Sequence, residues 1–272
     1  MLPFALNQMT TPNLHWEAFL DLAAELGCVG VELRNDLPGG MFGGDDPAIV
    51  GAAAKARGLR VLGLAQVVMF NDWSETKRAE AEAVMQAAVA LGAEGIALIP
   101  RNDNLGNADG VRQPALARAL TELLPMLRGH GLKGMVEPLG FEICSLRQKA
   151  EAVAAIEALN AGDTFKLVHD TFHHHLVGGG PLFARQTGIV HVSGVVDPAV
   201  SVSDMRDSHR VLVDAQDRLD NVGQIAALRA AGYTGAISFE PFAPSVHALT
   251  DFVGPLRKSM EFITAGVAAK AA

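Results

Sequence analysis

The feature that most constrains the fold is a unit that recurs along the chain. In this unit a helical segment ends at glycine, and a short apolar segment follows within a few residues. Gly27 precedes Val29–Leu33 in this way, and Gly92 precedes Gly95–Ile99. Glycine ends helices readily because it adopts the left-handed conformation without steric cost. Uninterrupted apolar segments are typical of strands buried on both faces of a parallel sheet. The unit is therefore the second half of a β-α-β repeat.

Eight apolar segments are expected to be strands, with helical patterns between them. They are Phe4–Asn7, Val29–Leu33, Arg60–Ala65, Gly95–Ile99, Gly134–Glu137, Lys166–Asp170, Ile189–Val192 and Ala236–Glu240. Strands and helices that alternate in this number predict an α/β fold, the (β/α)8 TIM barrel. We expect one barrel domain over residues 1–265 and a C-terminal tail over residues 266–272.

A doubly wound open sheet is the alternative arrangement of the same elements. If such a sheet bound nucleotides, a glycine-rich turn would have to follow its first strand, and Asn7–Thr10 is not one. The glycine-rich segment Gly178–Gly180 is followed by Pro181 and lacks the lysine and hydroxyl residue of a P-loop. The barrel is therefore favoured.

The composition excludes two classes of partner. The chain of 272 residues has 22 Lys and Arg against 30 Asp and Glu, a net charge of -8, so we expect no nucleic-acid partner. No apolar run reaches the roughly 18 residues of a membrane helix, and Met1–Leu6 lacks the basic start of a signal peptide. Cys28 and Cys144 stand in apolar segments and are expected to be buried free thiols. A cytoplasmic protein without a membrane partner follows.

Polar residues stand at or near the end of every predicted strand. They are Asn7, Glu32, Gln66, Arg101, Glu137, Asp170, His191 and Glu240. The carboxyl ends of barrel strands carry the functional groups of this fold. A charged group at a buried position must be paired or metal-bound, because an isolated buried carboxylate is very costly. Asn7 and Glu32 are candidates for substrate binding, and the last four strands bring three carboxylates and one imidazole to one point.

Glu137, Asp170, His191 and Glu240 make a candidate divalent-metal site. Carboxylates with one imidazole and no thiolate suit manganese or zinc, and also magnesium or cobalt. The four residues lie 33, 21 and 49 positions apart, so only the barrel would bring them together. Each alone has an ordinary explanation: a solvated strand end for either glutamate, a helix N-cap for Asp170, and a core histidine for His191.

Two further side chains are candidates for contact with a substrate. If Asp170 ends a strand, the residues after it form a loop over the site, which brings His173 close to a bound molecule. We expect His174 and His175 to lie in that loop or on the surface. Trp73 follows the third strand and is expected to form an apolar wall for a ring, the alternative being packing at the start of a helix.

Four segments resemble the metal-site motifs of the xylose isomerase-like TIM barrels, the sugar phosphate isomerase/epimerase superfamily. They are Glu137-Pro138-Leu139-Gly140, Asp170-Thr171-Phe172-His173, His191-Val192 and Ser238-Phe239-Glu240-Pro241. The resemblance covers nearly the whole chain, which within the superfamily most resembles the inosose (2-keto-myo-inositol) isomerases.

The resemblance implies a role for each matching residue. Glu137, Asp170, His191 and Glu240 correspond to the four metal ligands. His173 corresponds to a histidine that faces the substrate, and Arg210 to an arginine that reaches a substrate oxygen. Many relatives have a Pro-Gly-x-Gly turn after that arginine, whereas this chain has Val211–Ala215, so the loop over the substrate is expected to differ in shape.

Together these features predict a divalent-metal-dependent isomerase of a ketose or keto-inositol that acts by proton transfer through an enediolate. Glu137 and Glu240 stand on strands three apart and are expected to act as acid/base groups as well as ligands. The expected partner is a small polyol or ketose, and assembly into a homo-oligomer stays open.

Several alternatives use the same barrel. One is a ketose 3-epimerase or a hydroxypyruvate-type isomerase. Another is a metal-dependent lyase or dehydratase of a cyclic keto acid, for which Arg34, Arg101 and Arg210 could bind the carboxylate. An abasic-site endonuclease would need more histidine ligands and a basic surface. A carbohydrate-binding relative without activity should have lost one of the four ligands, and none is lost.

Overall fold

The strands pair in chain order, and β8 closes the circle against β1. In this computed structural model, which describes residues 2–271, every pairing in the barrel is parallel. The strands are β1 Phe4–Asn7, β2 Gly30–Arg34, β3 Arg60–Val68, β4 Gly95–Ile99, β5 Lys133–Val136, β6 Phe165–Asp170, β7 Thr187–Val192 and β8 Ile237–Phe239. The predicted (β/α)8 TIM barrel is confirmed, and the open sheet is excluded because a closed barrel has no sheet edges.

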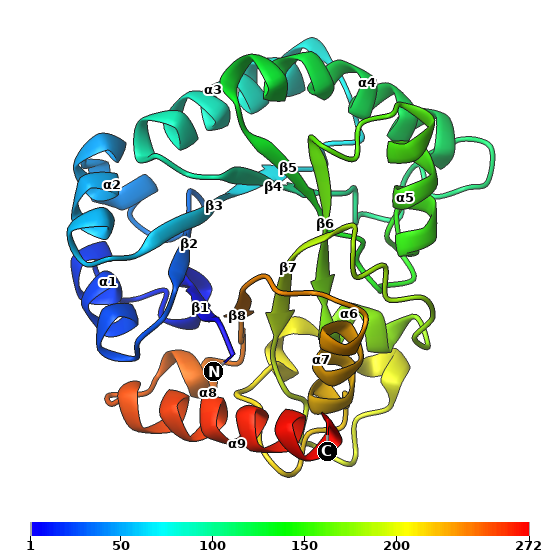
Figure 1. The fold of residues 1–272 in the computed structure, drawn as a ribbon. Helices are drawn as coiled ribbons and strands as arrows, with labels where there is room; N and C mark the ends of the chain where they lie inside the picture. Colours follow the sequence, from blue (N-terminus) through cyan, green and yellow to red (C-terminus); the bar gives the residue numbers. More distant parts are fainter. Residues whose placement is uncertain (1, 272) are drawn as a thin grey trace.

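Helices form an outer ring around the strands (Figure 1). They are α1 Trp16–Glu25, α2 Pro47–Ala56, α3 Glu75–Leu91, α4 Arg112–His130, α5 Lys149–Ala158, α6 Thr171–Leu176, α7 Asn221–Ala230, α8 Pro244–His247 and α9 Val253–Ala271. Within residues 2–271, four 3-10 helices lie in the connections: η1 Gln8–Thr10, η2 Met41–Gly44, η3 Val202–Asp204 and η4 Asp207–His209. Gly92 and Gly131, both with φ of 71°, end α3 and α4 in the left-handed conformation that the repeated unit predicts.

The C-terminal helix α9 continues through Ala271, so residues 266–271, predicted as a tail, are helical. Its buried residues include Leu256, Met260, Ile263 and Val267, whose spacing places them on one face. That face belongs to the main hydrophobic core, and α9 also packs against α7, so its last turns are held in place. Residue 272 lies outside the described residues.

The inside of the barrel changes character along the strands. Residues two apart on a strand point to the same face. Near the amino ends of the strands, the interior is a buried apolar cluster of Ala5, Leu62, Val168, Ile189 and Ala236. Two positions further along β1, β6 and β7, the same face carries Asn7, Asp170 and His191. The barrel therefore places its polar side chains together at the carboxyl ends of the strands.

The expectation for the two cysteines is settled by their burial. Cys28 and Cys144 are buried free thiols, as predicted. Burial raises the pKa of Cys28 to about 12 and the pKa of Cys144 to about 11, so both stay protonated at neutral pH. Among residues 2–271, no helix combines the length and the apolar character that a membrane span requires.

Candidate metal centre

Four titratable side chains from β5 to β8 meet inside the barrel mouth. Glu137 follows β5, Asp170 ends β6, His191 lies on β7 and Glu240 follows β8. One ligand-type atom of each lies within 4.8 Å of those of the others, and all four residues are buried. Asp170 and His191 are direct partners in the register of β6 and β7. The structure thus brings together the four residues predicted as metal ligands, while their binding of a metal stays a prediction.

A glutamate from β2 holds the far side of His191. The Nε2 atom of His191 lies 3.0 Å from Oε2 of Glu32, a hydrogen bond that fixes the orientation of the ring. The Nδ1 atom faces the cluster, 3.6 Å from Oε1 of Glu137 and 3.2 Å from Oε2 of Glu240. Within residues 2–271 this buried nitrogen makes no hydrogen bond. An imidazole held by a carboxylate on one nitrogen and open on the other is the usual arrangement of a metal-binding histidine.

The two carboxylate oxygens of Asp170 accept hydrogen bonds from different parts of the molecule. Its Oδ1 accepts hydrogen bonds from the backbone N–H of Phe172 at 2.7 Å and of His173 at 3.0 Å, so it caps α6. Its Oδ2 accepts a hydrogen bond of 2.5 Å from Arg210. The loop expected after Asp170 is therefore a helix, because the carboxylate satisfies the free N–H groups at the start of α6.

This helix separates the neighbouring histidines. His173 turns toward the barrel mouth, where its ring packs edge-on against Phe141 at 5.1 Å, and its buried Nδ1 has no hydrogen-bond partner among the described residues. His174, one position on and about 100° around the helix, packs against His169 at 4.9 Å. The expectation that His174 lies on the surface is wrong, since it is 8% exposed, and His175 is half-buried.

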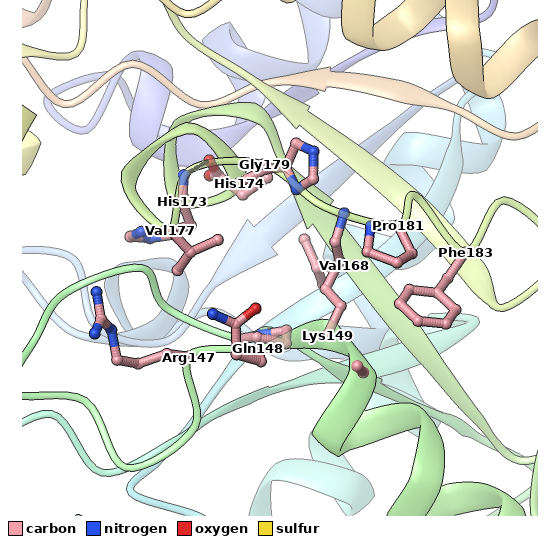
Figure 2. A pocket seen from close by; sticks show the side chains of 13 residues that line it. Arg147, Gln148, Lys149, Val168, His173, His174, Val177, Gly179, Pro181 and Phe183 are labelled. Carbon is pink, nitrogen blue, oxygen red and sulfur yellow. Dashed lines mark hydrogen bonds between the residues drawn. The ribbon is translucent and has the colours of Figure 1, made fainter.

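His174 lines a small cavity of its own between α5, α6 and the glycine-rich segment, where it lies near Lys149 and Gly179 (Figure 2). The Nζ atom of Lys149 lies 2.7 Å from Nδ1 of His169, whose Nε2 lies 2.9 Å from Oε1 of Gln224. Burial lowers the pKa of Lys149 to about 7 and that of His174 to about 4. The volume of about 20 Å³ has room for a water molecule and not for a substrate.

Two arginines neutralise part of the acidic cluster. Arg210 is fully buried, and its Nη2 donates to Asp170 and, at 3.1 Å, to Oε2 of Glu240. Arg34, at the end of β2, donates from Nη1 to Oε1 of Glu240 at 3.2 Å and forms two bonds of 2.8 Å with Asp36. Glu240 is therefore held between two guanidinium groups. Arg210 is thus a buried residue of the cluster and not a surface ion-pair residue.

The pKa values of Glu137 and Glu240 are shifted in opposite directions by their surroundings. Burial raises the pKa of Glu137 above its ordinary value. Burial also opposes ionisation of Glu240, but His191, Arg210 and Arg34 outweigh it and hold the pKa of Glu240 well below its ordinary value. Burial would lower the pKa of His191, yet the neighbouring carboxylates of Glu32 and Glu240 raise it well above its ordinary value. The cluster as a whole therefore attracts positive charge.

Three residues of the cluster, Glu137, His191 and Glu240, line a cavity of about 230 Å³, which we call the inner cavity, whereas Asp170 lines the small cavity near His174. Of the residues predicted to contact substrate, the wall contains Asn7, Glu32, His173 and Arg210. Trp73 is not part of this wall in the described structure, because it packs in the main hydrophobic core with Arg78 over its ring at 5.8 Å. Its placement matches the alternative of packing at the start of a helix.

The arginine expected at the barrel mouth after β4 forms ion pairs outside the inner cavity. Arg101 pairs with Asp72 at 3.0 Å and with Asp103 at 2.8 Å, and it does not line the inner cavity in the part of the chain that is described. Gln66, which lies two residues before the end of β3, does line it.

Two aromatic residues that line the inner cavity were not predicted from the sequence. Phe141 and Phe242 both line it, and Phe242 lies under the guanidinium of Arg210 at 4.6 Å. Both follow a predicted ligand within four residues, at Glu137 and Glu240, and this spacing is the signal that could have found them. The segment after Arg210 begins with an antiparallel bridge between Val211 and Gly194. It therefore lies beside the residues that come directly after β7.

Comparison with known proteins agrees with this geometry. The model of the family described as xylose isomerase-like TIM barrel matches residues 20–265. The chain belongs to the xylose isomerase-like TIM barrel family. The resemblance inferred from the four motifs is thereby confirmed. The inosose isomerase of Bacillus subtilis (strain 168) is 24% identical over 201 residues, which cover 71% of each chain.

Solved structures of the family superpose over nearly the whole chain. A xylose isomerase domain containing protein from Salmonella typhimurium LT2 is 30% identical, with a TM-score of 0.87, and the match covers 99% of this chain and 97% of that one. The IOLI protein, solved with a binding zinc atom, is 21% identical with a TM-score of 0.86, and the match covers 99% of both chains. At that identity the second likeness shows the fold alone.

Proposed function

We propose that this protein is a divalent-metal-dependent isomerase of a ketose or of a keto-inositol of the 2-keto-myo-inositol type, acting by proton transfer through an enediolate. The observation that carries the proposal is the buried cluster of three carboxylates and one imidazole beside a small cavity. The name of the curated inosose isomerase and the zinc atom in the IOLI structure support it.

The donor set fits a divalent cation. Glu137, Asp170, His191 and Glu240 would hold it, because His191 Nδ1 is buried, faces the carboxylates and has no hydrogen bond among the described residues. Manganese and zinc are the first candidates, and magnesium and cobalt also suit these ligands. When bound, the cation supplies Lewis-acid polarisation of a substrate carbonyl and offsets negative charge that develops on its oxygen.

Glu137 and Glu240 are the proposed acid/base groups. They stand on either side of His191 Nδ1, at 3.6 and 3.2 Å, and both line the inner cavity. A carboxylate in this position can take a proton from one substrate carbon and return it to the neighbouring carbon. Because β5 and β8 are three strands apart, the two carboxylates reach a bound molecule from different directions.

The other polar residues of the wall are proposed to orient the substrate. Arg210 and His173 would donate to substrate oxygens, and Asn7 and Glu32 would bind hydroxyl groups. The buried, multiply bonded guanidinium of Arg210 is held rigidly by Ser193, Asp170 and Glu240. Fixed donors of this kind cost little reorganisation during a reaction.

A ketose 3-epimerase is the second candidate, favoured by the same pair of carboxylates. In that reaction one carboxylate would remove the proton from one face of a carbon, and the other, in its protonated form, would deliver a different proton to the opposite face. A lyase of a cyclic keto acid is less favoured, because two of the three arginines that could bind its carboxylate, Arg34 and Arg101, are already paired with Asp36 and Asp103. The geometry does not single out a hydroxypyruvate-type isomerase.

The test is proton exchange followed by NMR in deuterated water. The metal-loaded protein is incubated with an inosose, a ketohexose and a pentulose, with Mn²⁺ or Zn²⁺. We expect deuterium at the carbon next to the carbonyl of the true substrate, and an isomeric product. Absence of deuterium across all three classes would overturn the proposal, as would a Glu240→Gln variant that keeps full metal-dependent activity.

A further inference from the structure

A second and larger cavity lies beside the inner one at the same end of the barrel. This outer cavity has a volume of about 540 Å³, against about 230 Å³ for the inner cavity. The two share Asn102, Phe141 and Asp207 in their walls. Phe141 is the junction, since its ring packs edge-on against His173 of the inner cavity at 5.1 Å. The two cavities are therefore direct neighbours, with Phe141 between them.

The wall of the outer cavity has an apolar part and a polar part. Phe141, Ile143, Leu176, Val202 and Met205 form the apolar part, and the polar residues beside them include Asn102, Glu142, Ser203 and Asp207. Ile143 is 43% exposed and Val202 is 41% exposed, although both are large apolar side chains. Exposed apolar side chains gathered around a concave surface mark a binding site for an apolar group.

Two arginines in this cavity are free of carboxylate partners. Arg147 donates to the carbonyl oxygen of Gly140 at 3.0 and 3.2 Å, and Nη1 of Arg206 donates to the carbonyl oxygens of Ser203 and Met205 at 2.8 and 2.7 Å. Over residues 2–271 neither guanidinium forms an ion pair with an acidic side chain. Guanidinium planes stack favourably on aromatic rings, so this pair favours an aryl group over an alkyl group.

We propose that the outer cavity is a subsite for an aryl group attached to the polyol held in the inner cavity, so that aryl-substituted polyols or ketoses belong to the substrate class. The identity of the group in the inner cavity rests on the proposed function. The shared wall at Phe141, the apolar lining and the two unpaired guanidinium groups all point to this occupant rather than to a second small polyol.

The test compares two ring polyols that differ only in the substituent. Binding of phenyl β-D-glucopyranoside and of methyl β-D-glucopyranoside to the Mn²⁺-loaded protein is measured by isothermal titration calorimetry. We expect the phenyl compound to bind at least about tenfold more tightly, because its ring leaves water for an apolar wall. Val202→Asp should remove that tenfold preference and leave the affinity for the methyl compound unchanged.

Val89 supplies the matched control, since this valine is 48% exposed on α3 and lies away from both cavities. Val89→Asp should keep the tenfold preference. Equal affinity for both compounds, or equal effects of the two aspartate variants, would overturn the subsite. A change of oligomeric state in Val202→Asp with no change in the preference would also overturn it, and would assign the face to contact between copies of the chain.

Failure of the proposed function gives a different result. In that case the unsubstituted ketoses and inososes show no isomerisation or deuterium exchange. Loss of the phenyl preference in Val202→Asp would still support an aryl-binding cavity. The two outcomes are read from separate experiments, so one can fail without the other.

Discussion

The interior of this barrel has two layers that come from the same strands and are both buried, yet are chemically opposite. On β6 the apolar layer contains Val168 and the polar layer contains Asp170, two positions on. On β7 the corresponding pair is Ile189 and His191. The apolar layer gains free energy from burial, whereas each charge in the polar layer costs free energy unless it is paired. On each of these strands, the residue that stabilises the fold and the residue of the candidate site are two positions apart.

The polar layer lowers its own cost with internal pairs. Arg210 contacts Asp170 and Glu240, Arg34 contacts Glu240, and His191 contacts Glu32. Glu137 is the carboxylate whose pKa burial raises, so it is the least compensated of the cluster. A bound divalent cation would supply the positive charge that this carboxylate lacks. We therefore expect substitutions in the polar layer to affect activity and those in the apolar layer to affect stability.

The largest effect is expected from Glu137→Gln. The amide keeps the size of the side chain but cannot accept the substrate proton, so metal-dependent isomerisation should fall about 10³-fold, equivalent to about 4 kcal/mol. The free energy of unfolding of the metal-free protein should change by less than about 1 kcal/mol, because one of several crowded carboxylates loses its charge. NMR rates and chemical denaturation measure the two quantities. Wild-type activity in this variant would remove Glu137 from the mechanism.

The opposite pattern is expected for Ile189→Ala in the apolar layer. Removing buried carbons should lower the free energy of unfolding by about 2–4 kcal/mol. Isomerisation by the folded fraction should stay within about twofold of wild type. Val89→Ala, at an exposed valine of α3, is the control and should cost less than about 0.5 kcal/mol. If Ile189→Ala lost activity while keeping its stability, the two layers would not be separate.

Glu32→Gln tests the support of the polar layer. The amide oxygen can still accept from His191 Nε2, but the negative charge behind the imidazole is lost. Affinity for Mn²⁺ should fall about 10–100-fold, the usual effect of changing the partner of a metal-binding histidine. Calorimetry measures this, with Glu94→Gln at an exposed ion pair with Arg60 as the control. Unchanged affinity in Glu32→Gln would show that the contact does not support metal binding.

The smallest effect is expected from Lys149, which lies outside both layers. Burial lowers its pKa from 10.5 to about 7, and it faces His169, His174 and Asp170. Between these pH values the unfolded chain binds more protons than the folded one, so this residue makes stability rise with pH. The slope is at most about 1.4 kcal/mol per pH unit, and Lys149→Met should remove it. Denaturation at several pH values tests this, and an unchanged slope would contradict it.

Much of the fold and of the site could be predicted, because the residues at the start and end of each strand are recognisable in the sequence. Glycine after helices and apolar segments before polar residues placed the eight strands, and parallel pairing then required Glu137, Asp170, His191 and Glu240 to converge. The structure agrees on both points.

The remainder depended on contacts between distant residues. Asp170 starts a helix, and only that helix turns His173 toward the inner cavity and His174 away from it. Trp73 packs in the core because of what surrounds it, which its position after β3 does not reveal. Arg34 contacts Glu240 across 206 positions of sequence, and no local spacing predicts such a pair.

Calorimetric titration of the chelator-treated protein with Mn²⁺ and with Zn²⁺ tests whether the polar layer is a metal centre. The structure predicts one equivalent of cation bound by wild type. It also predicts that His191→Gln, which removes the nitrogen facing the three carboxylates, weakens binding at least about 100-fold. Absence of binding by wild type, or equal binding by wild type and His191→Gln, would show that the polar layer is not a metal centre.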